Sequence, residues 1–357
     1  MSLNITTSCL KLVSRKFIGP IGKTMRMLLL NALTAAFLIQ IPDFSGLHAR
    51  AAVYTGDPKT IAHDFLDLEK AYGARKEDYA AIDRIINTSI ATIGTRKGYT
   101  TDEAVQTLRS IDSLLRKEGL TFKDNLLLGK GLDRKTIDCD NYAALYIAIA
   151  EVLKIPLVPV YAPNHSFIRF CFDDGTYLNW ETTQGKSQPD SYYIKTLRIP
   201  EKSIRSGVYM KILTRKEFIA VEYNNIGSYL MSIRKFGDAV PYFSAAIQLN
   251  PLFSSAYHNR GTVHYAMNRL KEALADLLKA NSLDPSRAST HNTLGDIYFD
   301  QKEYDRAVHE YTAGIRIDPT NHAPYNSIGL IMKIQKKEDM AQKWLNKSKE
   351  IKKMHSR

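Results

Sequence analysis

The strongest constraint on the fold is a step of 34 residues that recurs between residues 218 and 353. Glycine, alanine and proline each return at this step. Their positions are Gly227, Gly261, Gly295 and Gly329, then Ala239, Ala273, Ala307 and Ala341, and finally Pro251, Pro285 and Pro319. Small residues at a fixed step indicate close helix crossings, and a proline ends each unit. The period predicts an all-α solenoid of four helix-turn-helix units.

Bulky residues agree with the same register, because Tyr223, Tyr257 and Tyr325 each stand four positions before a glycine. In this pattern the segment resembles the tetratricopeptide repeat. The resemblance implies a surface that binds a protein or peptide partner. We expect one polar residue of each first helix to form a ladder that hydrogen-bonds a peptide backbone, the alternative being a hydrophilic groove without a ligand. The ladder consists of Asn224, His258, Asn292 and Asn326.

A second feature is a cysteine at the start of a long apolar helix. Asp138 predicts an N-cap for a buried helix over residues 139–154, so Cys139 occupies the first helical position. Unpaired backbone N–H groups and the helix dipole favour a thiolate there. His165 begins a predicted strand and Glu181 lies in the next one. The order predicts a nucleophile, its base and an orienting residue, although an isolated cysteine is more often a small buried apolar residue.

The length of one hairpin loop decides whether these residues meet. Strands are predicted over residues 157–161, 165–172 and 176–182. If Gly175 adopts a left-handed conformation in a three-residue loop, His165, Asn179 and Glu181 share one face of the sheet. Glu181 is then the diagonal neighbour of His165. A loop of two residues would turn Glu181 to the other face. Asn179 is the alternative orienter.

The stretch 138–185 resembles the transglutaminase-like superfamily of papain-type cysteine enzymes, and the similarity covers about residues 108–209. By that resemblance Cys139 is the nucleophile, His165 the general base and Glu181 the residue that orients the imidazole. The family more often has aspartate at the third position. The implied reaction is acyl transfer from a carboxamide or peptide carbonyl through a thioester.

Further residues near this stretch have predicted roles in substrate binding. Arg169 and Trp180 are candidates to contact substrate, with an ion pair to Asp173 or Glu181 as the alternative for Arg169. Cys171 lies roughly 20 Å along the strand from His165, so we expect it to be unpaired and inert. The backbone N–H of Cys139 is one expected oxyanion donor. Candidates for a side-chain donor are Asn125, Asn141 and Asn164.

The N-terminal segment 1–51 has the parts of a secretory signal peptide. Basic residues precede an apolar run over 27–41, and the triplet 49–51 is small-x-small. The run is short for a membrane span, which needs about 20 residues. We expect export to the periplasm or medium, with an uncleaved membrane anchor as the alternative.

Composition argues against several other classes of function. The formal net charge is +12, but no dense Lys/Arg run indicates nucleic-acid binding. The nine histidines are scattered without paired ligand spacing, so no metal is expected. Glycine motifs that cradle phosphate are absent from the sequence, and no cofactor is expected.

Together these features predict an α+β papain/transglutaminase-like domain over residues 52–215, followed by an all-α tetratricopeptide-repeat solenoid over 218–353. The expected function is that of an exported cysteine peptidase, amidase or acyltransferase whose repeats bind a partner. The alternative is a non-catalytic repeat scaffold whose papain-like domain is a binding module.

Overall fold

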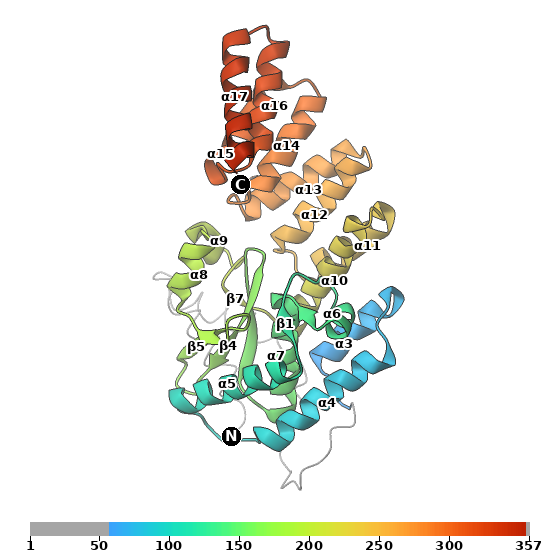
Figure 1. Cartoon of the computed structure of the whole chain (residues 1–357), viewed down its shortest axis with the longest axis vertical. Coiled ribbons are helices and arrows are strands. Elements are labelled where there is room, and N and C mark those ends of the chain that lie inside the picture. Colours follow the sequence, from blue (N-terminus) through green and yellow to red (C-terminus); the bar gives the residue numbers. More distant parts are fainter. Residues whose placement is uncertain (1–56, 355–357) are drawn as a thin grey trace, which may run out of the picture.

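Helices pack around a five-stranded sheet in the first half of the chain, and a helical solenoid leads away from it in the second half (Figure 1). The computed structural model describes residues 57–354. The predicted signal peptide or anchor over residues 1–51 lies outside the described residues. In the described part, no helix is long and apolar enough to cross a membrane.

Most of the segment before Gly119 is helical. The first helices are α3 (Ile61–Glu69), η1 (Lys70–Tyr72), α4 (Lys76–Thr92) and α5 (Thr101–Lys117), with α6 (Leu128–Arg134) after the short strand β1 (Thr121–Phe122). Thr100 caps α5, because its hydroxyl accepts from the backbone N–H of Glu103 and the Glu103 carboxylate accepts from the N–H of Thr100. Ile82, Ile86 and Leu108 are fully buried.

Helix α7 (Cys139–Leu153) follows strand β2 (Thr136–Ile137) and lies at the centre of the sheet-containing part. Asp138 caps it by accepting from the backbone N–H of Asn141, as the sequence predicts. Apolar residues occur all around the helix, and most of its residues are buried. This burial holds the first turn of α7 in a fixed position.

The sheet has the strand order β6–β5–β4–β3–β7. Its strands are β3 (Leu157–Ala162), β4 (His165–Cys171), β5 (Tyr177–Glu181), β6 (Lys186–Ser187) and β7 (Lys211–Ile212), with α8 (Asp190–Thr196) and α9 (Glu201–Arg205) between the last two. Arg169 pairs with Asn179. The register predicted for a three-residue loop is therefore confirmed. Gly175 has a φ of 83°, which a side chain would disfavour.

The solenoid consists of four pairs of helices. They are α10 (Arg215–Ser232) with α11 (Phe236–Leu249), α12 (Ser254–Ala266) with α13 (Leu270–Leu283), α14 (Ala288–Asp300) with α15 (Tyr304–Ile317), and α16 (His322–Ile334) with α17 (Glu338–Met354). The recurring glycines lie where the helices of a pair touch. A Cβ atom on Gly295 would lie 2.7 Å from the ring of Tyr311, which is too close for any real contact. The 34-residue step thus reflects packing inside each unit.

The sheet-containing part and the first repeats share one hydrophobic core. The ring centroids of Phe65 in α3 and Phe218 in α10 are 5.3 Å apart, and those of Tyr161 in β3 and Phe253 before α12 are 5.1 Å apart. Arg215 adds an ion pair to Asp64 at 2.7 Å. The repeats are therefore packed onto the sheet-containing part rather than joined to it by a free linker.

Candidate functional site

The structure brings His165 and Glu181 together. Nε2 of His165 lies 2.6 Å from Oε2 of Glu181, which is only 2% exposed. The contact follows from the hairpin register, which makes the two residues diagonal neighbours on one face. No described residue forms a hydrogen bond with the other ring nitrogen, Nδ1. The Cys139 thiol donates to Oδ1 of Asp140 at 3.9 Å.

Thr183 holds the second oxygen of the same carboxylate. Its hydroxyl donates to Oε1 of Glu181 at 2.5 Å, and its backbone N–H donates to the same atom at 3.2 Å. Burial by itself raises the pKa of Glu181, but the hydrogen bond and charge of His165, together with the bonds from Thr183, bring this pKa below its ordinary value. Glu181 is thus held as a carboxylate that faces the imidazole.

Cys139 lies at the first position of α7, where the prediction placed it, and is half-buried. Its sulfur interacts with the backbone N–H of Ser166, the residue that follows His165 in β4. The start of α7 and the start of β4 therefore meet. The catalytic roles of Cys139, His165 and Glu181 stay predictions.

The expectation that the helix terminus favours a thiolate is wrong for Cys139. Burial raises the pKa of the thiol well above its ordinary value, and the carboxyls of Asp140 and Asp138 raise it further. The N–H of Ser166 lowers this pKa but does not compensate. Because burial and nearby acids raise its pKa, Cys139 is a neutral thiol at neutral pH.

Asn179 and Arg169 belong to a separate polar cluster. Oδ1 of Asn179 accepts from Nε of Arg169 at 2.8 Å, and Oδ1 of Asp190 accepts from Nη2 of Arg169 at 2.9 Å. The guanidinium also lies 3.9 Å from the centre of the Tyr177 ring. Arg169 is buried, and its charge is paired inside the protein. Asn179 is thus bound to Arg169 and not to His165. Arg169 forms an ion pair, as its alternative role predicts, but the partner is Asp190 and not Asp173 or Glu181.

Trp180 lies on the opposite face of the sheet and is 1% exposed. Its indole N–H donates to the hydroxyl of Tyr146 in α7 at 3.2 Å. A side chain in this position has no surface for a substrate, so its predicted role in substrate binding is wrong. Cys171 is buried, and its sulfur is not in a disulfide bond with Cys139.

Two of the three candidate oxyanion donors, Asn141 and Asn125, donate to backbone carbonyls. The Asn141 side-chain amide donates to the backbone carbonyl of Asn125 at 2.9 Å, and the Asn125 amide donates to the carbonyl of Thr136 at 3.1 Å. Oδ1 of Asn164 accepts from Arg287. None of these three contacts directs an N–H group at Cys139.

The four predicted ladder residues do not form one exposed row. Oδ1 of Asn224 accepts from the side chain of Asn259 at 2.9 Å, and the ring of His258 contacts the hydroxyl of Thr290 at 3.0 Å. Both side chains are buried. Asn292 is half-buried, and Asn326 is exposed. Asn224 and His258 are therefore bound to neighbouring side chains within the solenoid. The 34-residue period alone does not indicate these contacts.

Two side chains of the solenoid contact residues next to Cys139 and His165, and no sequence pattern predicted these contacts. Nδ2 of Asn225 in α10 donates to Oδ2 of Asp140 at 3.2 Å. Arg287, between α13 and α14, contacts Asn164, the neighbour of His165. Both pairs join residues far apart in the chain, so spacing along the sequence gave no indication of them.

Comparison with known proteins supports the repeat assignment. The family model described as TPR repeat matches residues 261–302 and 295–335, and the one described as tetratricopeptide repeat matches residues 223–251. No curated protein matches the chain.

Solved structures with similarity to the chain include a crystal structure of MamA, with 25% identity and a TM-score of 0.37 over 38% of this chain and 80% of that one. MamA from Desulfovibrio magneticus RS-1 has 18% identity and a TM-score of 0.36 over 38% of this chain and 76% of that one. PilF from Pseudomonas aeruginosa has 19% identity and a TM-score of 0.36 over 39% and 63%. The family matches confirm that the C-terminal part of this chain consists of tetratricopeptide repeats.

Proposed function

We propose that this protein is an interaction scaffold whose repeats bind a protein partner. The observation that supports this best is the confirmed repeat register, because stacked repeats of this kind form extended binding surfaces. The first repeats pack against the sheet-containing part through their shared core. A partner is therefore expected at repeats 2 to 4.

A small pocket at those repeats suggests the chemistry of the partner. It has a volume of about 180 Å³ and lies between the first helices of three successive repeats. Tyr265 of α12 and Phe299 of α14 supply aromatic walls, and Leu330 of α16 is 42% exposed beside them. Asp296 and Asp300 supply carboxylates. Aromatic rings and carboxylates together favour a cationic side chain.

Among residues 57–354, the two carboxylates accept hydrogen bonds only from tyrosine hydroxyls. Tyr311 donates to Asp296 and Tyr265 donates to Asp300, each at 2.7 Å. Burial raises the pKa of Asp296, and Asp300 adds to the effect. No Lys or Arg among residues 57–354 forms an ion pair with either group. A lysine or arginine of the partner would supply the missing positive charge.

Binding of short peptides tests this proposal. Fluorescence polarisation with the full chain should show tighter binding of Lys- or Arg-containing peptides than of otherwise identical Gln-containing peptides. Asp296→Asn combined with Asp300→Asn should remove that preference. Glu338→Gln with Asp339→Asn is the matched control, because both residues are exposed at the start of α17, outside the pocket. Equal binding of cationic and neutral peptides by the wild type would exclude the proposed partner chemistry.

A second candidate function is cysteine-dependent acyl transfer, favoured by the 2.6 Å contact between His165 and Glu181 and by the interaction of Cys139 with the backbone N–H of Ser166, the neighbour of His165. In that reaction Nδ1 of His165 takes the thiol proton while Sγ of Cys139 bonds to the carbonyl carbon. The C–N bond then breaks, and the leaving amine takes the proton from His165. Water or an amine releases the acyl group from the thioester. The raised thiol pKa makes this transfer to His165 necessary, because little thiolate exists beforehand.

Alkylation of Cys139 tests the second candidate without a known substrate. Iodoacetamide modification, followed by peptide mass spectrometry, gives separate rates for Cys139 and Cys171. If His165 acts as the base, His165→Asn should lower the rate at Cys139 near pH 7 by about tenfold or more. An unchanged rate at Cys139 would leave only the scaffold function.

A further inference from the structure

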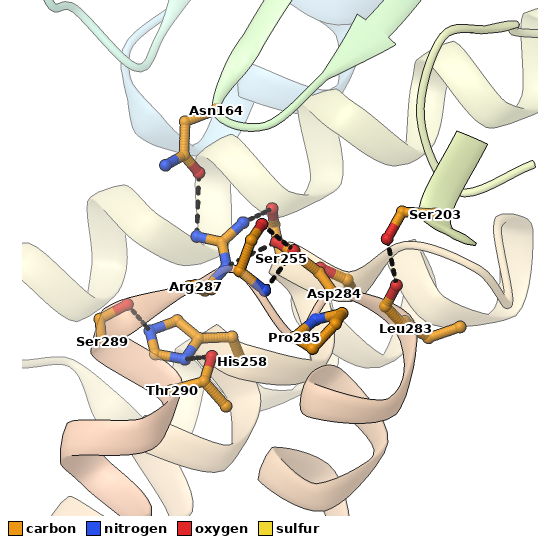
Figure 2. A network of polar contacts seen from close by, with 12 residues as sticks. Asn164, Ser203, Ser255, His258, Leu283, Asp284, Pro285, Arg287, Ser289 and Thr290 are labelled. Atoms are coloured by element: carbon orange, nitrogen blue, oxygen red, sulfur yellow. Dashed lines mark hydrogen bonds and ion pairs between the residues drawn. The ribbon is translucent and has the colours of Figure 1, made fainter. Parts of the chain in front are cut away.

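The turn that leads into His165 is held from the repeat domain. Ala162 pairs with His165, so Pro163 and Asn164 form a two-residue turn in which Asn164 has a φ of 51°. Nη1 of Arg287, in the loop between α13 and α14, donates to Oδ1 of Asn164 at 2.9 Å (Figure 2). The residue before the candidate base is thus tied to the junction of repeats 2 and 3.

Arg287 is itself fixed by its surroundings. Its side chain is 11% exposed, its Nη2 donates to Oγ of Ser255 at 2.7 Å, and its Nε lies 3.8 Å from Oδ2 of Asp284. Ser255 Oγ also lies 3.0 Å from the hydroxyl of Tyr161 in β3. Because the guanidinium is a rigid planar fork, its contacts with the repeats fix the direction of the donor that reaches Asn164.

The same junction touches the sheet-containing part at other points. The hydroxyl of Tyr209 donates to Oδ2 of Asp284 at 2.7 Å. The hydroxyl of Ser203 donates to the carbonyl of Leu283 at 3.1 Å (Figure 2). Asp284, Ser203 and Tyr209 are buried. The loop that carries Arg287 therefore contacts both the repeats and the sheet-containing part, and these contacts fix its position.

We propose that Arg287 is a positioning residue through which the repeat domain orients His165. It acts by holding Oδ1 of Asn164, so the start of β4 faces the start of α7 in one arrangement. The functional consequence rests on the acyl-transfer candidate, since a base must lie within hydrogen-bond reach of the thiol. A displacement of about 1 Å can reduce catalysis on the order of 100-fold.

Variants on both sides of the Arg287–Asn164 contact test this role in the full chain. Arg287→Gln removes the fork, and Asn164→Gly removes the acceptor while tolerating a positive φ. Asn164→Asp keeps an acceptor and adds a charge that favours Arg287. Arg306→Gln is the control, because Arg306 is an exposed arginine of α15 that pairs with Glu303 in the same repeat. Thermal unfolding and circular dichroism establish that each variant is folded.

The measured quantity is the rate of Cys139 alkylation from pH 5 to 10. Each variant is measured with and without His165→Asn, and the difference gives the part of the rate that depends on His165. We expect Arg287→Gln and Asn164→Gly each to lower it on the order of tenfold. The double variant should show no further loss, because both changes remove one contact. Asn164→Asp should retain the rate, and Arg306→Gln should match the wild type. A full rate in folded Arg287→Gln or Asn164→Gly would overturn the proposal.

A second measurement separates this proposal from the acyl-transfer candidate. If His165→Asn leaves the wild-type rate unchanged, the acyl-transfer candidate fails, and the ¹⁵N resonances of the His165 ring then decide the positioning role. Arg287→Gln should change the tautomer or titration of this ring, whereas Arg306→Gln should not. Identical ring resonances in Arg287→Gln and the wild type would overturn the positioning role.

Discussion

Oε2 of Glu181 lies 2.6 Å from Nε2 of His165, although the residues are in different strands and are not directly opposite in the ladder. The contact exists because a three-residue loop joins β4 to β5. A buried carboxylate in this position fixes the orientation of the imidazole ring. The contact should therefore contribute to the free energy of unfolding.

Replacing Glu181 by Gln should destabilise the protein by about 1.5–3 kcal/mol at pH 7, the range for a hydrogen bond to a charged group. The pKa of Glu181 is lowered in the folded state, so its stabilising contribution is present above the unfolded pKa and is lost as the pH falls through the folded value. Urea unfolding of wild type and variant at pH 7 and at pH 3 measures this. The difference should shrink at pH 3.

A double-mutant cycle with His165→Asn controls that experiment. If the cost of Glu181→Gln comes from the imidazole, the two changes are non-additive. Additive costs would mean that Thr183, and not His165, accounts for the effect.

Asp140→Asn should make Cys139 more reactive at neutral pH. Asp140 raises the pKa of the thiol, second only to burial, so removing its charge lowers that pKa. The rate of iodoacetamide modification near pH 8 should rise several-fold, with the alkaline limb of the pH profile moved to lower pH. Asp133→Asn serves as a control, since Asp133 is exposed and pairs with Arg75. An unchanged profile would show that burial alone suppresses the thiolate.

Gly175→Ala should lower the free energy of unfolding by roughly 1–2 kcal/mol, because an L-residue in the left-handed region is strained. Gly237→Ala is the matched control. A Cβ on Gly237 meets no atom within 4 Å, and alanine favours its helix, α11. Thermal unfolding should therefore show a loss in the first variant and no loss in the second. Equal effects would contradict the role of Gly175 in the hairpin.

Glu222→Gln should stabilise the protein at pH 8 more than at pH 5. Neither carboxyl oxygen of Glu222 in α10 has a conventional donor among the described residues, and its neighbour is the buried Glu69 of α3. Burial raises the pKa of Glu69 to about 7 and that of Glu222 well above its ordinary value. Two adjacent acids form a hydrogen bond only if one keeps a proton, whereas a glutamine amide can donate to Glu69 at any pH.

The sign of this effect follows from the raised pKa values. Groups of this kind stabilise the fold below their unfolded pKa, near 4.5, and that contribution is lost as the pH rises through the folded value, about 7 for Glu69. The gain in Glu222→Gln should reach on the order of 1–3 kcal/mol at pH 8. Glu201→Gln is an exposed control. A gain independent of pH would exclude the shared proton.

Local patterns in the sequence determined most of the architecture. The 34-residue step predicted the solenoid, because each step marks a contact within one unit, such as Gly295 against Tyr311. Hydrophobic periodicity and the Asp138 cap predicted α7, and the turn chemistry of Gly175 predicted the hairpin register that brings Glu181 to His165. These signals are local, so one sequence is sufficient to read them.

Tertiary packing alone decided the chemical environment of Cys139 and the long-range contacts of the site, which residue spacing does not indicate. The thiol pKa of Cys139 is raised by burial and by Asp140, whereas the sequence indicated only the position of Cys139 at the start of a helix. The docking of Arg287 on Asn164 joins residues 123 positions apart. Contacts of this kind form only because the solenoid and the sheet-containing part share one core. They depend on shape complementarity and on burial of polar groups, and neither produces a periodic pattern in the sequence.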